Sequence, residues 1–205
     1  GLAIVSLGRK VGYVDSKGRL IIDLIYEEYP NFVEKGSFKS SMAIVSKNGK
    51  YGLIDKVGNQ ILPFKYLQIG AISYLTAFNK GKGWGFFDLN YDIKIKSTYD
   101  FAESFENGFA LIQKGNKWGV IDTSGSEVIA PLYNEITRML DFSFVVADSG
   151  KFGLFDLKGK ELAPIIYDQI RLVKDDFILL LKEEELSYYQ ISTRKIIQPI
   201  KKEDE

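Results

Sequence analysis

The chain has 205 residues, 45% of them hydrophobic, and its 27 basic residues balance its 27 acidic residues. A neutral chain argues against a nucleic-acid partner, which needs a basic face, and against a polybasic membrane anchor. The absence of cysteine excludes disulfides and thiolate metal sites, and the absence of histidine removes the commonest general base and metal ligand. No apolar run approaches the roughly 20 residues of a membrane-spanning helix, and the start, GLAIVSLGRK, lacks the pattern of a signal peptide.

A five-residue frame recurs along the chain: an apolar or aromatic residue, a glycine, two apolar residues and an aspartate. In chain order the copies are VGYVD at 11–15, YGLID at 51–55, WGFFD at 84–88, WGVID at 118–122 and FGLFD at 152–156. Their first residues lie 40, 33, 34 and 34 positions apart, and a worn copy, LSYYQ, starts at Leu186 after another 34. A fixed period of this size predicts a tandem-repeat architecture.

The copy at 108–133 shows what one repeat contains. It reads GFALIQKGNKWGVIDTSGSEVIAPLY, with short apolar runs at 109–113, 118–122 and 127–129 separated by glycine-containing turns. Such runs predict a three-stranded antiparallel meander. A helical repeat of similar length is the rival, but two glycines within seven residues and the β-branched runs argue against it.

Six such repeats are predicted to form a single repeat domain. They span 1–26, 41–66, 74–99, 108–133, 142–167 and 176–200, followed by a tail at 201–205. Four of the five connectors have 7 or 8 residues, whereas the first, 27–40, has 14. In five repeats a tyrosine that should pack with its hydroxyl at the rim follows the first frame residue by fifteen positions: Tyr26, Tyr66, Tyr99, Tyr133 and Tyr167.

The frame is predicted to build the repeat rather than to perform chemistry. Both faces of the middle strand carry apolar side chains, so neighbouring sheets should stack face to face. The glycine should leave a bare patch that a large ring of the next repeat covers, and the aspartate should accept backbone N–H bonds in the following turn. The structural positions are Gly12, Asp15, Gly52, Asp55, Trp84, Gly85, Asp88, Trp118, Gly119, Asp122, Gly153 and Asp156.

Two all-β arrangements of the stacked meanders are possible. We expect an open solenoid or superhelix, and the alternative is a closed, six-bladed, propeller-like ring. The sixth repeat contains the charged stretch KEEE at 182–185 and lacks a Trp-Gly pair. Terminal repeats of open arrays are often more polar, so this repeat is expected to be an end cap.

The sequence resembles the bacterial WG-containing repeat, also called the KWG repeat. The resemblance rests on KWGVID at 117–122, the glycine turn after it, the proline shortly before Tyr133 and FENGFA at 105–110, and it covers nearly the whole chain. Tryptophan, however, occurs only at Trp84 and Trp118, and the sixth copy has LS for WG and Gln190 for the aspartate. The resemblance implies a noncatalytic β-repeat array that offers no catalytic residues to carry over.

Function is therefore sought where the repeats differ. The long first connector holds Tyr29, Phe32 and Phe38, which are candidate binding residues for another protein, although the loop could equally fold over the first repeat as a cap. A carbohydrate or small-ligand binder that uses Tyr29 and Phe32 is the alternative. A hydrolase with paired carboxylates ranks last, because no distinctive pair stands out from the repeats.

The expected function is that of a noncatalytic scaffold that mediates protein–protein interaction, within a larger bacterial assembly. We expect no enzyme activity, catalytic residue, cofactor or metal site. The expected partner is another protein, with a glycan as a possibility and with neither nucleic acid nor direct membrane insertion. The compartment stays open, the bacterial cell envelope or the extracellular space being favoured over the cytoplasm.

Overall fold

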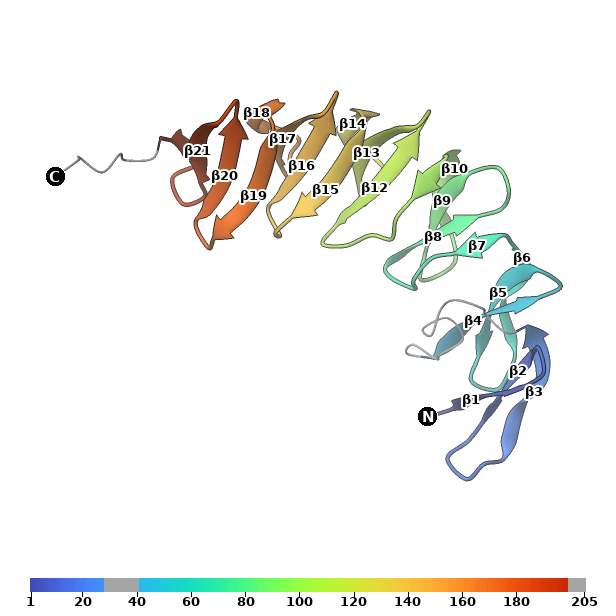
Figure 1. Cartoon of the computed structure of the whole chain (residues 1–205). Helices are drawn as coiled ribbons and strands as arrows, with labels where there is room; N and C mark the ends of the chain where they lie inside the picture. Colours follow the sequence, from blue (N-terminus) through green and yellow to red (C-terminus); the bar gives the residue numbers. More distant parts are fainter. Residues whose placement is uncertain (28–40, 199–205) are drawn as a thin grey trace. The chain divides into compact units, whose positions relative to one another are not determined.

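The computed structural model describes residues 1–27 and 41–198, and this part of the chain is built from β-strands without a helix (Figure 1). The chain forms two compact halves, Gly1–Glu106 and Asn107–Glu205. Each half holds three of the repeats, numbered one to six in chain order. Within each half small antiparallel sheets follow one another as in a solenoid, and no sheet of the described residues closes into a barrel. The predicted all-β repeat fold is therefore confirmed.

The N-terminal half contains two antiparallel sheets. One has the strand order β1-β2-β3-β4-β5-β6 and combines repeats one and two, which meet at the pair Glu27–Ser46. The other has the order β10-β9-β8-β7 and belongs to repeat three. The strands of this half are β1 (Ala3–Leu7), β2 (Lys10–Val14), β3 (Leu20–Glu27), β4 (Met42–Lys47), β5 (Lys50–Asp55), β6 (Gln60–Tyr66), β7 (Gln68–Ile69), β8 (Leu75–Asn79), β9 (Trp84–Asp88), β10 (Ile93–Tyr99) and β11 (Phe101–Ala102).

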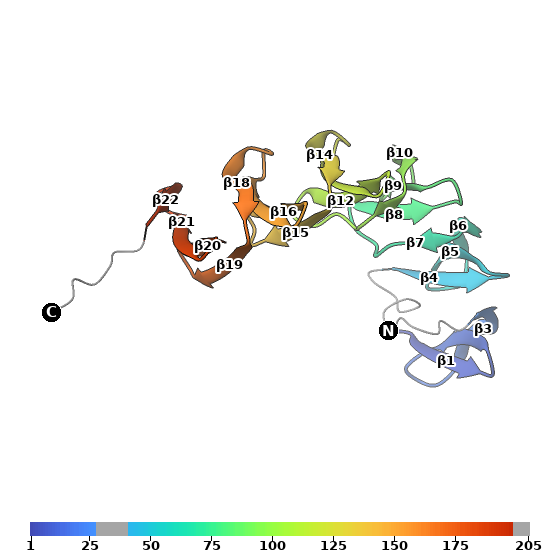
Figure 2. The same cartoon turned by 45° about the horizontal axis from the view of Figure 1, so that its top comes forward.

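The C-terminal half contains one sheet for each of repeats four to six. The strand orders in this half are β12-β13-β14, β15-β16-β17-β18 and β19-β20-β21-β22. In Figure 2, β14 and β18 lie along one border of the half, and β15 and β19 lie along the other. The strands are β12 (Phe109–Lys114), β13 (Lys117–Asp122), β14 (Glu127–Tyr133), β15 (Glu135–Met139), β16 (Ser143–Asp148), β17 (Lys151–Asp156), β18 (Glu161–Tyr167), β19 (Gln169–Lys174), β20 (Phe177–Lys182), β21 (Glu185–Gln190) and β22 (Lys195–Ile197).

The last two connectors are strands rather than loops, which differs from the sequence prediction. Strand β15 pairs with β16 over five residues, and β19 pairs in the same way with β20. Each sheet therefore gains a fourth strand ahead of the predicted meander. The first strand of a meander has an unpaired edge, and the extended connector satisfies the N–H and C=O groups of that edge.

The frame glycine lies opposite a bulge in the third strand of its own sheet. In repeat four, Trp118 pairs with Tyr133 and Val120 pairs with Ile129, so that Gly119 alone faces the three residues 130–132. A Cβ atom on Gly119 would lie 2.8 Å from the carbonyl oxygen of Ile129. The same register and the same close approach recur at Gly12, Gly52, Gly85 and Gly153.

The predicted covering of the glycine by a ring of the next repeat is therefore wrong. The space beside each frame glycine is filled by the third strand of the same sheet, most often by its backbone. Two extra residues in that strand force it to arch toward the middle strand, and only a residue without a side chain accommodates the arch.

The frame aspartate holds the turn that follows it. In repeat four, Asp122 Oδ1 accepts hydrogen bonds from the backbone N–H groups of Ser124 at 2.9 Å and Ser126 at 3.1 Å. The N–H groups two and four positions after the aspartate make the same pair of bonds at Asp15, Asp55, Asp88 and Asp156. The five carboxylates thus satisfy turn donors that would otherwise lack a protein partner.

The two apolar frame residues pack against opposite neighbours. In repeat five, Leu154 belongs to a core shared with Ile178 and Tyr189 of repeat six, whereas Phe155 belongs to a core shared with repeat four. The ring of Tyr133 from repeat four lies against Phe155 at a centroid distance of 5.9 Å. Repeats one and two, and repeats two and three, share cores in the same way. Each core is therefore completed only by two adjacent repeats.

A second carboxylate, sixteen positions after the first frame residue, joins neighbouring repeats. Asp168, the residue that follows β18, accepts a hydrogen bond at 2.5 Å from Lys151 of repeat five and another at 2.8 Å from the N–H of Glu183 in repeat six. Glu27 joins repeats one and two in a similar way, because it accepts hydrogen bonds from the N–H groups of Asn48 and Gly49. These bonds connect the third strand of one repeat to the first turn of the next.

Acidification should weaken the contact that Asp168 makes. The hydrogen bond from Lys151, followed by that from Glu183, holds the pKa of Asp168 below its usual value. A depressed carboxyl pKa contributes stability that is complete above the ordinary value near 4 and is lost as the pH falls through the lower folded-state pKa. Urea unfolding of the Asp168→Asn variant should therefore depend less on pH below about pH 4 than that of the parent chain.

The matched control for this prediction is Asp175→Asn. Asp175 is exposed, and no residue of the described ranges hydrogen-bonds its side chain. This variant should keep the acid dependence of the parent chain. Identical acid dependence in all three proteins would show that Asp168 contributes nothing to the contact between repeats five and six.

Candidate functional site

The aromatic residues proposed from the sequence as a binding surface lie outside the described residues. Tyr29, Phe32 and Phe38 all fall within 28–40, so their role stays a prediction. The twelve frame positions lie in the middle strands and at their ends, where they form sheets, cores and turns as described above. A candidate site must therefore be sought elsewhere.

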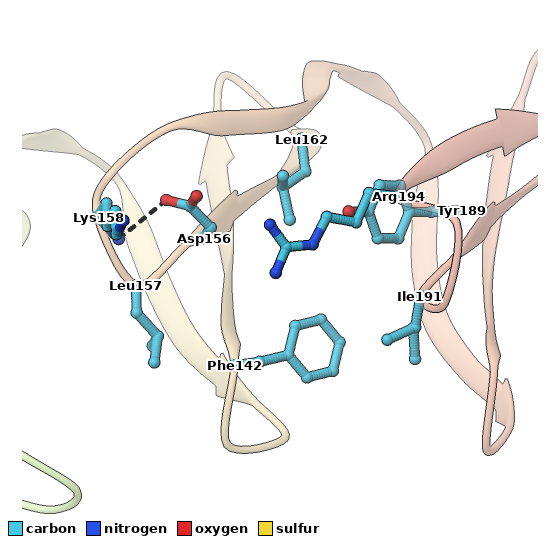
Figure 3. A pocket seen from close by; sticks show the side chains of 8 residues that line it. All are labelled: Phe142, Asp156, Leu157, Lys158, Leu162, Tyr189, Ile191 and Arg194. Carbon is cyan, nitrogen blue, oxygen red and sulfur yellow. Dashed lines mark hydrogen bonds between the residues drawn. The ribbon is translucent and has the colours of Figure 1, made fainter.

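A cavity of about 410 Å³ opens between repeats five and six (Figure 3). Repeat five contributes Phe142, which precedes β16, the end of β17 with its turn, and Leu162 of β18. Repeat six contributes Tyr189 of β21 and the turn that follows it. The lining residues are Phe142, Asp156, Leu157, Lys158, Leu162, Tyr189, Ile191 and Arg194. The volume lies within the range of about 300–1,000 Å³ that is typical of small-ligand pockets.

The cavity lies where the repeat frame is not preserved. Between repeats four and five, the turn glycine Gly159 packs against Val128 so closely that a Cβ atom would overlap the Val128 carbonyl oxygen. The corresponding residue of repeat six is Thr193, seven positions after Leu186. A threonine side chain cannot enter such a contact, and the turn of repeat six leaves a space beside Leu162.

A different carboxylate holds the turn of repeat six. Gln190 occupies the frame position of the aspartate, and Asp176, which precedes β20, takes over its role. Asp176 accepts hydrogen bonds from the N–H of Ser192 at 2.7 Å and from the side-chain amide of Gln190 at 2.9 Å. The turn that carries Arg194 is thus anchored, although the frame residues that anchor the other turns are missing.

The charged groups of the cavity are separate from one another. Figure 3 shows the guanidinium of Arg194 extending into the cavity between Asp156 and Phe142. Its side chain makes no ion pair or hydrogen bond with any residue of 1–27 or 41–198. The Oδ1 atom of Asp156 accepts hydrogen bonds from the turn N–H groups of Lys158 and Lys160. Its Oδ2 atom has no hydrogen-bond partner among residues 1–27 and 41–198.

The walls between these charges are apolar. Phe142, Leu157, Leu162 and Ile191 are half-buried, and Tyr189 is 3% exposed. Burial raises the pKa of the Tyr189 hydroxyl above its usual value, an effect that the nearby Arg194 opposes and the Asp156 carboxylate increases. The phenol is therefore neutral at physiological pH and can donate or accept a hydrogen bond.

Sequence reasoning did not find this site. Its residues become neighbours only through the contact between repeats five and six, which no motif within one repeat reveals. The altered frame LSYYQ indicated that repeat six differs from the others and predicted an end cap, but it did not indicate a cavity. Among the described residues, no group of three or more acidic side chains could hold a metal ion, and no helix is long and apolar enough to cross a membrane.

The chain is similar to several solved structures at low sequence identity. The chain is similar to a structure described as the eukaryotic initiation factor, with a TM-score of 0.50, 11% identity and coverage of 93% of this chain and 59% of that one. It is also similar to Citrobacter koseri AztD (TM-score 0.46, 11% identity, 93% and 66% covered) and to Kluyveromyces lactis Hsv2 (0.42, 12%, 76% and 58%). The chain thus spans less than two thirds of each of these structures, and the likeness concerns the fold alone.

Comparison of the sequence with protein families gives a direct result. A search of curated proteins found no match. The WG containing repeat matches five times in tandem, at 12–51, 51–74, 84–118, 118–141 and 152–184, which together exceed half of the chain. The matches include the five glycine–aspartate frames, whose bulges and turns recur in the structure. This chain belongs to the WG-containing repeat family.

Proposed function

We propose that the chain is a noncatalytic repeat scaffold that binds another protein and that the cavity between repeats five and six anchors the partner. The repeat family and the β-rich fold indicate a repeat scaffold or binding module. The observation that supports a specific anchor is the exposed guanidinium of Arg194, which lies beside apolar walls and makes no ion pair or hydrogen bond with residues 1–27 and 41–198. Arginine and aromatic side chains are frequent energetic centres of protein interfaces, where the bound partner excludes water from them.

Site-specific photo-crosslinking tests this proposal in cells that express the chain. A benzophenone amino acid at position 191 places the reactive group in the cavity. The control position is Leu132 of β14, which is 65% exposed and does not line the cavity. We expect discrete protein adducts from position 191 alone, and we expect Arg194→Glu to abolish them because it reverses the charge that attracts the partner.

Two results would contradict the protein-binding proposal. The first is the same set of adducts from positions 191 and 132, which would indicate random encounters. The second is an adduct at position 191 that Arg194→Glu leaves unchanged, which would remove the cavity charge from the interaction. Identification of the adducts by mass spectrometry gives the partner.

A carbohydrate is the second candidate ligand. The cavity brings together two aromatic side chains, Phe142 and Tyr189, and the carboxylate of Asp156, which is the combination that a sugar-binding groove needs. Sugar rings pack their C–H faces against aromatic rings while carboxylates accept hydroxyl hydrogen bonds. Saturable glycan binding that is lost in Phe142→Ala, together with no protein adduct, would favour this candidate over the first.

A further inference from the structure

We infer that the cavity receives the carboxyl-terminal residue of a partner polypeptide, with an apolar last side chain and a free α-carboxylate. This inference rests on the proposed protein-binding function and specifies which part of the partner enters the site. It follows from the charge of the lining, from an unused hydrogen-bond acceptor and from the placement of the apolar walls.

The charge of the lining favours an anion. Lys158 and Arg194 contribute two positive charges and Asp156 contributes one negative charge, so the cavity carries a net charge of +1. A peptide carboxylate brings a single negative charge, whereas a free amino acid is a zwitterion without net charge. Both cations are exposed and accessible to a ligand, and arginine binds carboxylates through two parallel, charge-assisted hydrogen bonds.

The free Oδ2 atom of Asp156 favours a ligand that carries a hydrogen-bond donor close to its own carboxylate. Asp156 uses Oδ1 for its own turn, and its Oδ2 atom has no partner among residues 1–27 and 41–198. The last peptide nitrogen of a polypeptide is bonded directly to the Cα atom that carries the α-carboxylate, so its N–H group lies close to that anion. A fatty acid offers a carboxylate and an apolar chain but no such donor, so it forms no hydrogen bond with Asp156.

The apolar walls lie beside the charges in one cavity rather than in a separate groove. Phe142 and Ile191 lie below the guanidinium of Arg194 in Figure 3, and Leu162 lies above it. At a carboxyl terminus the side chain, the carboxylate and the N–H group share one Cα atom, so the three contacts can form within a single small site. Capture of a terminal carboxylate is an established mode of peptide recognition in other folds.

Binding of short synthetic peptides to the whole chain tests the inference. Fluorescein-Ala-Ala-Ala-Leu with a free carboxylate is compared by fluorescence anisotropy with the same peptide ending in an amide. We expect the acid to bind at least about tenfold more tightly than the amide. Arg194→Ala should remove this difference and Arg194→Lys should keep part of it, because lysine retains the charge but not the paired donors.

Arg171→Ala is the matched control, since Arg171 is an exposed arginine of β19 that does not line the cavity. This variant should bind both peptides as the parent chain does, and circular dichroism should show that all variants keep their β-structure. Equal binding of acid and amide would overturn the inference. So would binding of octanoate, of free leucine, or of an amidated peptide with an internal glutamate as tightly as the acid peptide.

The peptide experiment and the crosslinking experiment can fail independently. A protein adduct at position 191 without any preference for the free carboxylate would overturn the terminal-residue inference and leave the scaffold function standing. A clear preference for the free carboxylate without a protein adduct would overturn the proposed scaffold function in the cells tested and leave the chemistry of the cavity standing.

Discussion

Gly119→Ala should destabilise the C-terminal half by about 3 kcal/mol or more, which is the upper end of the cost of overpacking. The added Cβ would lie 2.8 Å from both the Ile129 carbonyl oxygen and the Pro131 nitrogen. These neighbours are backbone atoms of the arched third strand, so no side-chain rotation relieves the clash. A loss of this size is a large fraction of the 5–15 kcal/mol that stabilises an ordinary domain.

Gly150→Ala separates this steric effect from the general cost of replacing a glycine. Gly150 has φ +78° and nothing within 4 Å of its Cβ position, so alanine there should cost only about 1 kcal/mol through backbone strain. Urea unfolding followed by circular dichroism and by tryptophan fluorescence would measure both variants. Equal losses in Gly119→Ala and Gly150→Ala would refute the proposed role of the bulge.

The neighbouring substitutions Leu154→Ala and Phe155→Ala should loosen opposite faces of repeat five. Both side chains lie in cores, with exposed fractions of 0% and 7%. Removal of a buried leucine or phenylalanine costs about 2–5 kcal/mol in lost burial and residual cavity. Because Leu154 packs on repeat six and Phe155 on repeat four, the two variants should weaken different contacts although they change adjacent residues.

Hydrogen exchange locates each of these effects. Leu154→Ala should reduce protection chiefly in β20 and β21, and Phe155→Ala should reduce it in β12 to β14. Exposed Leu132 provides the control, since Leu132→Ala should leave both regions protected. A uniform loss of protection in both core variants would mean that the C-terminal half unfolds as one unit and that its two cores are not separable.

The sequence predicted the repeat because its spacing constrains local structure. The aspartate and the glycine three residues after it identify a turn, and Asp122 and Gly125 form that turn in repeat four. The bare glycine correctly indicated a close approach but not the strand that makes it. That information lies in the register of the third strand, where two residues more than expected separate the pairs made by Val120 and Trp118.

The features that escaped prediction depend on contacts between repeats. Strand β19 alternates polar and apolar residues only over its first four positions, QIRL, and five of its six residues are exposed, so this short pattern did not distinguish a strand from a connector. Asp176 replaces the frame aspartate from the turn between β19 and β20, which the sequence of LSYYQ alone does not show. The cavity likewise forms only where the intact frame of repeat five lies against the altered frame of repeat six.

The bulges have a further consequence for the border strands of the C-terminal half. Strands β14 and β18 end their sheets and therefore present free backbone groups to the surroundings. A straight border strand is a template on which other chains can add strands and aggregate. In both strands the arch over the frame glycine interrupts this template, and Pro131 and Pro164 each remove an N–H donor from it. The same backbone distortion that makes glycine obligatory inside the repeat thus protects the half from uncontrolled sheet growth.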